Sequence, residues 1–140
     1  MAGKTFRHDH RVTYADCTLG NHVYYARYLD ILEAARGELF RQLGQSFLHW
    51  QDRDTIFPVI DCRLRYKRAA RYDELLRIEL WLTTLGKMRL DFAYQVFAPN
   101  RRLLIEAMTQ HVCTNVVSKP KRIPEELAAS LAPYVAARVP

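Results

Sequence analysis

The sequence contains no long apolar run. No stretch of its 140 residues approaches the roughly 20 consecutive apolar residues that span a bilayer. The beginning of the chain is polar and lacks the apolar segment of a secretory signal. We therefore expect a cytoplasmic protein with no membrane partner. The 49% hydrophobic and 26% charged residues are typical of a globular chain, which we expect to form one domain over residues 1–140.

Cysteine is scarce, and its spacing excludes two classes of small, cross-linked protein. Cys17, Cys62 and Cys113 are isolated, with no C-x-x-C pair. An odd, scattered set argues against a disulfide framework or a cysteine zinc site. Four histidines likewise share no metal-like spacing: His8, His10, His49 and His111. We expect no metal site.

Positive charge, in contrast, is in excess. The net charge is +6, which favours anionic partners, although a solvated basic surface is the alternative. No helix-turn-helix, zinc finger or RNA-binding aromatic signature is present, so we expect no nucleic-acid partner. Two compact clusters suit a small phosphate-bearing molecule better: Arg63, Arg65, Lys67, Arg68, Arg71 and Arg77, then Lys119, Lys121 and Arg122.

The hydrophobic pattern changes period along the chain. Alternation predicts strands over residues 7–14, 58–67, 74–85, 88–97 and 103–117, and the turns between the later strands are short enough to make them antiparallel. Spacings of three and four predict a helix over residues 24–43, which Gly44 ends. Residues 16–21 form a loop before this helix, and residues 124–137 form a short terminal helix.

This order predicts a two-layer α+β domain. A curved antiparallel sheet of about five strands wraps a long central helix, and a short C-terminal helix follows. Small residues at Ala34, Ala35 and Gly37 allow another layer to approach the helix closely. The outward-facing Trp81 and Phe97 suggest that another subunit covers part of the sheet.

The stretch from Tyr14 to Asp30, followed by Glu33-Ala34-Ala35-Arg36, resembles the 4-hydroxybenzoyl-CoA thioesterase-like branch of the hotdog superfamily. The family signature is close to D-x-D-x-x-G-H-V-x-x-x-x-Y-x-x-x-x-E-x-A-R. Seven positions match it without a gap: Asp16, His22, Val23, Tyr28, Glu33, Ala35 and Arg36. Residues 66–75 are similar to the Y-x-x-P-A-x-Y-D-D segment of the family. The element order agrees with the hotdog fold over nearly the whole chain.

The resemblance implies hydrolysis of an acyl-CoA or acyl-carrier thioester, in a homodimer or homotetramer with sites at the subunit interfaces. The coenzyme A moiety is then part of the substrate, and no separate cofactor is required. Two positions depart from the family. Thr18 stands where the family has its second Asp, the usual nucleophile or general base, and Asn21 replaces the Gly before His22. The match therefore implies the fold but not the family mechanism.

The chemistry requires an activated water or nucleophile and a donor for the developing oxyanion. Free N–H groups at the start of the helix can polarise a carbonyl, and the resemblance places the relevant amide at Tyr25; an ordinary water-capped helix end is the alternative. Asp16 is either a replacement base or a structural acceptor for loop amides. His22 is a candidate for proton transfer, because histidine is the side chain whose ordinary titration range suits it near neutral pH, or else it supports the loop. Thr18 can position water, and Asn21 can hold water or preserve the turn.

Three further assignments are open. Glu33 either approaches a partner subunit or acyl tunnel, or pairs with Arg36 or Arg27. Lys67, Arg68 and Arg71 are candidates for the phosphates of coenzyme A. Aromatic residues that line an acyl pocket or belong to the core are Tyr24, Tyr25 and Phe47. The alternative functions are a catalytically silent acyl-thioester binding protein, prompted by Thr18, and an enoyl-CoA hydratase or dehydratase that uses His22 and Glu33.

Overall fold

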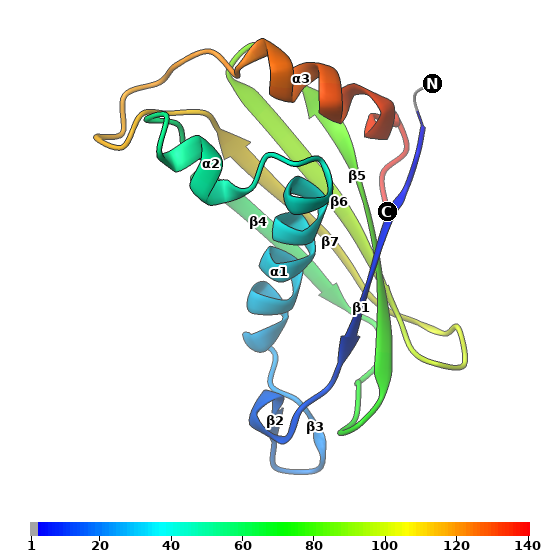
Figure 1. Cartoon of the computed structure of the whole chain (residues 1–140). Coiled ribbons are helices and arrows are strands. Elements are labelled where there is room, and N and C mark those ends of the chain that lie inside the picture. The colour runs from blue at the N-terminus through cyan, green and yellow to red at the C-terminus, as the bar shows by residue number, and fades with distance from the viewer. Residues whose placement is uncertain (1–2) are drawn as a thin grey trace.

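A computed structural model of the chain describes residues 3–140 (Figure 1). Its elements, in chain order, are β1 (Phe6–Arg11), the 3₁₀ turn η1 (Tyr14–Asp16), β2 (Cys17–Thr18), β3 (His22–Val23), α1 (Arg27–Gln42), α2 (Phe47–Gln51), β4 (Val59–Tyr66), β5 (Leu75–Leu85), β6 (Arg89–Phe97), β7 (Leu103–Val112), α3 (Glu125–Leu131) and the 3₁₀ turn η2 (Ala132–Tyr134).

Five strands form one antiparallel sheet in the order β1-β5-β6-β7-β4. The sheet curves around α1, which lies across one of its faces (Figure 1). Helix α3 packs beside β5, near both ends of the chain. The edges of the sheet are β1 and β4, whereas β2 and β3 make a separate short hairpin. This is the hotdog arrangement that the sequence predicts, and the predicted fold is confirmed.

The core forms where the apolar stripe of α1 meets the alternating inward residues of the sheet. Five side chains of α1 are almost fully buried at spacings of three and four: Tyr28, Ile31, Leu32, Ala35 and Leu39. The inward positions of β5 have no exposed surface: Leu76, Ile78, Leu80 and Leu82. Burial of these alternating residues fixes the register, since a slip by one residue would turn all of them to solvent.

The end of α1 follows the predicted glycine stop. Gly44 has a φ of 74°, and its N–H donates to the carbonyl of Arg41 at 3.0 Å. The Gln45 N–H reaches back to the carbonyl of Phe40 at 3.1 Å, which completes a Schellman motif. This cap satisfies helix carbonyls that would otherwise be unpaired.

The beginning of α1 differs from the prediction. The helix starts at Arg27 rather than at residue 24, because the Tyr24 N–H donates to the Asp16 carbonyl at 2.9 Å and extends the entry segment. The first strand also ends earlier, at Arg11, and a 3₁₀ turn follows at Tyr14–Asp16. The predicted loop contains β2 and the turn that leads to β3, β7 stops at Val112, and α3 ends at Leu131.

The prediction of close packing at the small residues of α1 holds for two of the three. Ala35 is fully buried, and a Cβ at Gly37 would meet the ring of Phe47 in α2 at 3.4 Å, whereas Ala34 is exposed. The prediction for Trp81 was wrong. Trp81 is covered by the chain's own C-terminal segment and not by another subunit. Its Nε1 donates to the Arg138 carbonyl at 2.8 Å, and the Arg138 guanidinium lies 3.6 Å from the ring centroid.

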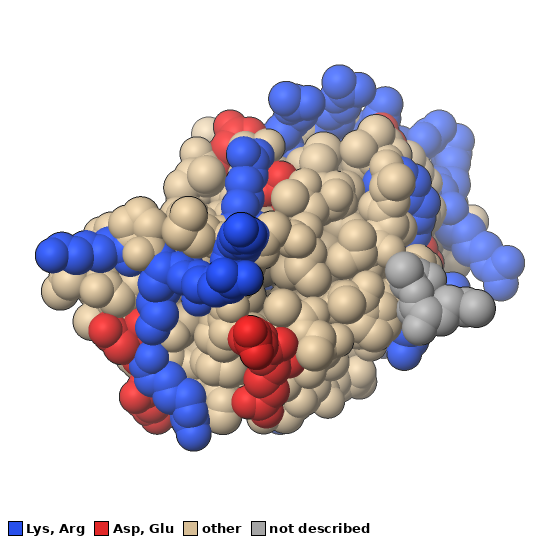
Figure 2. All heavy atoms as spheres, turned by 90° about the horizontal axis from the view of Figure 1, so that it is seen from above, with Lys and Arg blue, Asp and Glu red and all other residues tan. Residues whose placement is uncertain are grey.

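Basic side chains are distributed over several parts of the surface. Figure 2, which views the molecule from above, shows Lys and Arg side chains in separate groups with Asp and Glu between them. They do not form one continuous stripe on this face. Within residues 3–140, no helix is long and apolar enough to cross a membrane.

Candidate active site

The β2–β3 hairpin forms a tight turn immediately before α1. Thr18 and His22 lie opposite each other in the hairpin, and Gly20 and Asn21 between them have φ values of 86° and 58°. Asn21 thus adopts the left-handed conformation expected of it. Its Oδ1 accepts from the Tyr72 N–H at 3.1 Å, so the side-chain oxygen is engaged in holding the turn.

Arg71 also holds this turn. Its Nη1 donates to the carbonyls of Gly20 and Asn21, each at 3.1 Å. The Val23 N–H donates to the carbonyl of Ala70 at 2.9 Å, which ties the same two segments together. The structure therefore places Arg71 behind the hairpin, in contact with the backbone of the turn.

An open pocket of about 550 Å³ lies between the hairpin, the start of α1 and the end of β4. It brings together five of the predicted site residues and one that the sequence did not single out: Thr18, His22, Tyr25, Lys67, Arg68 and Tyr66. Asp16, Asn21, Glu33 and Arg71 are not among the residues that line it. The predicted site residues thus divide between the pocket and its surroundings.

The Tyr25 amide lies two residues before the first residue of α1. Among residues 3–140 the Tyr25 N–H has no hydrogen-bond acceptor, and neither has that of Ala26, the N-cap. The Tyr25 carbonyl accepts from the Tyr66 hydroxyl at 3.0 Å, which helps to fix the plane of the Tyr25–Ala26 peptide. Free N–H groups at the start of a helix carry partial positive charge and can stabilise an oxyanion.

His22 is half-buried, and its imidazole makes no hydrogen bond with residues 3–140. A Cβ at Gly20 would lie 3.3 Å from the ring, so glycine provides room for the imidazole as well as the turn conformation. Because α1 begins at Arg27, His22 does not cap the helix. The side chain is positioned at the pocket with both nitrogens free for a substrate or water.

Tyrosines form the apolar wall of the pocket. Tyr66 contacts the rings of Tyr25 and Tyr28, with centroid distances of 6.4 and 5.8 Å. Tyr24 lies against Tyr25 at 4.8 Å. Burial raises the pKa of Tyr28 to about 12, so its hydroxyl stays protonated. Tyr24 and Tyr25 therefore line the site rather than the core.

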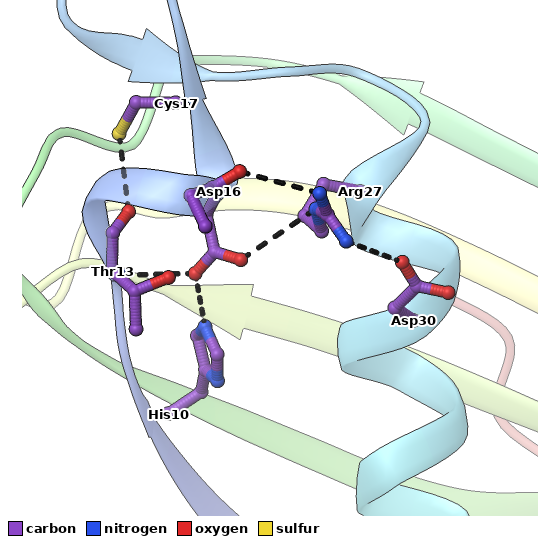
Figure 3. A network of polar contacts seen from close by, with 7 residues as sticks. His10, Thr13, Asp16, Cys17, Arg27 and Asp30 are labelled. Atoms are coloured by element: carbon purple, nitrogen blue, oxygen red, sulfur yellow. Dashed lines mark hydrogen bonds and ion pairs between the residues drawn. The ribbon is translucent and has the colours of Figure 1, made fainter.

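Asp16 belongs to a polar network beside the pocket (Figure 3). Its Oδ2 accepts from the Thr13 N–H at 2.9 Å and lies 2.8 Å from Nε2 of His10. The Nε atom of Arg27 lies 3.7 Å from Oδ1, and Arg27 also pairs with Asp30 at 3.1 Å. Burial opposes ionisation of Asp16, but the bonds from Thr13 and His10 outweigh it and lower the pKa of Asp16. Its oxygens are thus occupied by protein groups.

Lys67 and Arg68, the two predicted coenzyme A ligands at the pocket, each contact a group of the protein. The Lys67 Nζ lies 3.4 Å from a carboxylate oxygen of Glu106, and the Arg68 Nη1 makes a long contact of 3.5 Å with the Leu103 carbonyl. Both side chains are exposed at the pocket. In residues 3–140 no group of three or more His, Cys, Asp or Glu side chains is placed to hold a metal ion.

Glu33 lies elsewhere. It is exposed on α1 and lines a second cavity together with Arg36 and Phe47, away from His22. Within residues 3–140 it pairs with neither Arg27 nor Arg36. A single chain therefore does not bring Glu33 and His22 into one site, as the hydratase alternative requires.

Comparisons with known proteins agree with this geometry. Residues 12–131 match the family described as the thioesterase-like superfamily. The acyl-CoA thioester hydrolase YbgC of Escherichia coli O6:H1 is 30% identical over 125 residues, which are 89% of this chain and 93% of that protein. The crystal structure of TT1821 from Thermus thermophilus is 28% identical, covers 91% of this chain and 98% of its own, and has a TM-score of 0.85.

A further solved structure is similar in fold. The 1,4-dihydroxy-2-naphthoyl-CoA thioesterase Slr0204 from Synechocystis has a TM-score of 0.85 at 21% identity, covering 91% of this chain and 96% of its own. The family match extends over most of the chain and includes the hairpin, α1 and strands β4 to β7 of the sheet. The chain therefore belongs to the thioesterase-like superfamily.

Proposed function

We propose that this protein hydrolyses acyl-CoA thioesters to a free acid and coenzyme A in the pocket between the β2–β3 hairpin, the start of α1 and the end of β4. The observation that carries the proposal is the unpaired Tyr25 N–H at the entrance to α1, beside a histidine with free ring nitrogens. Membership of the thioesterase-like superfamily supports the reaction class. The name of the relative YbgC supports acyl-CoA as the substrate.

In this proposal the thioester carbonyl oxygen accepts a hydrogen bond from the Tyr25 N–H. His22 takes a proton from a water molecule, which attacks the carbonyl carbon, and the tetrahedral intermediate is stabilised by the amide. The C–S bond then breaks, and His22 returns the proton to the leaving thiolate. Thr18, opposite His22 in the hairpin, orients the water.

Asp16 has a positioning role in the proposal. Its carboxylate is already bonded to Thr13 and His10 and lies near Arg27, so it holds η1 against the entry to α1. This arrangement fixes the backbone that leads into the hairpin. Asn21 and Arg71 fix the other end of the hairpin through Tyr72 and Gly20.

Lys67 and Arg68 are the proposed contacts of the coenzyme A phosphates, because both are exposed cations at the rim of the pocket. The coenzyme A moiety enters as part of the substrate, and we propose no resident cofactor. An acyl-carrier protein would present the same thioester on a phosphopantetheine arm, and a substrate comparison distinguishes the two carriers. The single-domain organisation over residues 1–140 and the cytoplasmic location remain predictions.

We further propose a homodimer that forms through β4. Seven of the eight residues of this edge strand are exposed, against three of six in the other edge strand, β1. Val59 and Ile60 are 47% and 56% exposed. An unpaired edge with exposed apolar residues is a ready surface for a second strand. The homotetramer remains a prediction.

A thiol-release assay over a panel of saturated acyl-CoAs tests the proposed function. We expect thiol release that depends on His22. Hydration of an enoyl-CoA without thiol release would replace the proposal by a hydratase. Tight binding of acyl-CoA with neither reaction would replace it by a silent binding protein, the alternative that Thr18 prompts.

A further inference from the structure

Arg36, in the middle of α1, is a buried cation that pairs with no acidic side chain of residues 3–140. The residue is 8% exposed, and its Nη1 donates to the Tyr94 hydroxyl at 3.0 Å. Within residues 3–140 no carboxylate oxygen lies within 4.0 Å of its guanidinium. A buried charge is costly unless it is paired. Within residues 3–140 no atom of Arg36 is among the fully buried polar atoms without a partner, so its remaining donors are accessible from the cavity that it lines and are open to a ligand there.

Donors and acceptors can be assigned in the hydrogen bonds that connect Tyr94, the partner of Arg36, to Thr109 and His111. The Phe57 carbonyl, 3.0 Å from Nδ1 of His111, can only accept, so Nδ1 carries the proton. Burial, with the nearby Arg36 charge, lowers the pKa of His111 to about 4, so the ring is neutral and Nε2 accepts from the Thr109 hydroxyl at 2.8 Å. The Thr109 oxygen then accepts from the Tyr94 hydroxyl at 2.6 Å.

These hydrogen bonds use every proton that His111, Thr109 and Tyr94 can donate. The Tyr94 oxygen accepts from one of the five N–H donors of the Arg36 guanidinium, and none of these three side chains carries a negative charge. The other donors have no acceptor among residues 3–140. Arg36 is thus held in one orientation by Tyr94 while most of its hydrogen-bonding capacity remains free.

Arg36 lines a cavity of about 370 Å³ whose other walls are mainly apolar. This volume is within the range of small-molecule sites, which typically combine apolar walls with a few placed polar groups. The cavity lies between α1, α2 and the Val59 end of β4. Four aromatic side chains contribute to its walls: Phe40, Phe47, Phe57 and Phe92.

The proposed dimer connects this cavity to the active site. The pocket at the Tyr66 end of β4 and the cavity at the Val59 end are separated by the strand, about 23 Å in extended chain. Antiparallel pairing of two β4 strands brings the pocket of each protomer to the cavity of its partner. An acyl group whose thioester is bound at one pocket then points toward the partner's cavity.

We propose that the Arg36 guanidinium binds a carboxylate at the end of the acyl group remote from the thioester, so that the preferred substrates are coenzyme A thioesters of dicarboxylic acids. This inference rests on the proposed thioesterase function and names its substrate class. A carboxylate matches the planar fork of a guanidinium and supplies the missing negative charge. The aromatic walls accept the apolar middle of such an acyl group.

The test compares kcat/KM for matched thioesters with and without a terminal carboxylate: adipyl- against hexanoyl-CoA, suberyl- against octanoyl-CoA, and 4-carboxybenzoyl- against benzoyl-CoA. The wild-type protein should prefer one carboxylated series by about tenfold or more, since a charge-assisted hydrogen bond is worth at least that factor. Arg36→Met should lower this ratio about tenfold or more. Arg41→Met, the same substitution at an exposed position of the same helix, should leave the ratio unchanged.

Glu33 provides a second variant for the test, because it lines the same cavity and is the nearest alternative partner for Arg36 along the helix. Glu33→Gln should keep or raise the ratio, since it removes a negative charge from the cavity. A fall in the ratio equal to that of Arg36→Met would overturn the inference in favour of a Glu33–Arg36 pair. A wild-type preference for the uncharged substrates, or an equal loss of both substrates in folded Arg36→Met, would overturn it as well.

A failure of the proposed function has a different signature. If the wild-type protein releases thiol from no thioester in either series, the thioesterase proposal fails, and calorimetric titration with adipate, suberate and terephthalate tests the cavity by itself. Binding that Arg36→Met and Arg36→Lys weaken, while Arg41→Met does not, would support the carboxylate site. Absence of binding to all three acids would overturn it. Thermal unfolding of each variant identifies any loss of fold.

Discussion

The Nδ1 atom of His111 lies 3.0 Å from the carbonyl oxygen of Phe57, and this contact fixes the tautomer of a histidine that is 2% exposed. Burial lowers the pKa of His111 from its ordinary 6.5 to about 4. Between these values the unfolded chain binds a proton that the folded chain excludes, so stability increases with pH across this window. The contribution is complete above about pH 6.5 and is lost as the pH falls toward 4.

We therefore predict that the free energy of unfolding falls by about 3 kcal/mol between pH 7 and pH 4 because of His111 alone. Urea unfolding at a series of pH values measures this loss. His111→Gln should flatten the curve over the window, whereas the same substitution at His8, outside the core on β1, should leave it unchanged. Equal slopes in the wild-type and His111→Gln proteins would contradict the prediction.

The pattern of apolar residues was sufficient to predict the sheet and the helix but not the entry to the helix. Leu76, Ile78 and Leu80 alternate in sequence because one face of β5 is buried, and all three have no exposed surface. Tyr24 and Tyr25 fit the same helical spacing as the buried face of α1, yet they are 46% and 62% exposed. Periodicity cannot distinguish a core aromatic residue from one that lines a pocket.

Short elements and long-range polar contacts were missed for other reasons. Residues 47–51 are too few for a periodic signal, although Ser46, whose Oγ accepts from the His49 N–H at 3.2 Å, is a recognisable cap. Arg36 matched the family signature without a role, because its hydrogen-bond partner comes from β6, far along the sequence. Tyr94 bonds Arg36, and Thr109 bonds Tyr94 in turn, only because the β6–β7 register brings the two strands together.

Asp16 offers a test of positioning against catalysis. Asp16→Asn removes a charged acceptor from Thr13 and His10 and the opposite charge near Arg27, so we predict a loss of about 1–3 kcal/mol in the free energy of unfolding. Because the pKa of Asp16 is lowered below its ordinary 3.8, its own contribution to stability is lost only as the pH falls below about 3.8.

The pH profile of kcat distinguishes the two roles of Asp16. If Asp16 holds the hairpin, Asp16→Asn should change kcat without moving the acid limb of the profile, and His10→Ala should reproduce part of the stability loss. Disappearance of the acid limb in Asp16→Asn at an unchanged stability would identify Asp16 as the base instead. Asp9→Asn on β1 provides the control, because the Asp9 carboxylate makes no side-chain hydrogen bond or ion pair within residues 3–140.

His22 should carry the proton transfer. We predict that His22→Ala lowers kcat by about 10²-fold or more at pH 7, since general base catalysis typically contributes that factor. Thr18→Val should have a smaller effect, because the hydroxyl orients water and does not take the proton. Steady-state thiol release measures both variants, and His8→Ala is the matched histidine control. A His22→Ala enzyme with near wild-type kcat would reject the assignment.

A substitution on the edge strand β4 tests the proposed dimer. Ile60 is 56% exposed on β4, and Ile60→Glu would place a carboxylate without a partner in the proposed dimer interface. We predict that the dissociation constant of the dimer rises about tenfold or more, because an unpaired charge is costly to bury. Sedimentation at several protein concentrations measures the equilibrium. Val117→Glu, at a 68% exposed position outside the sheet, should leave it unchanged.

We also predict that kcat/KM depends on the fraction of protein that is dimeric, in the same set of variants. If the pocket at the Tyr66 end of β4 is completed by a second protomer, the kcat/KM of Ile60→Glu should fall at low protein concentration and recover as the concentration increases. The wild-type and Val117→Glu proteins should show no such dependence over the same range. A fully active Ile60→Glu monomer would show that one protomer suffices, and the acyl group would then have to lie within the chain that binds its thioester.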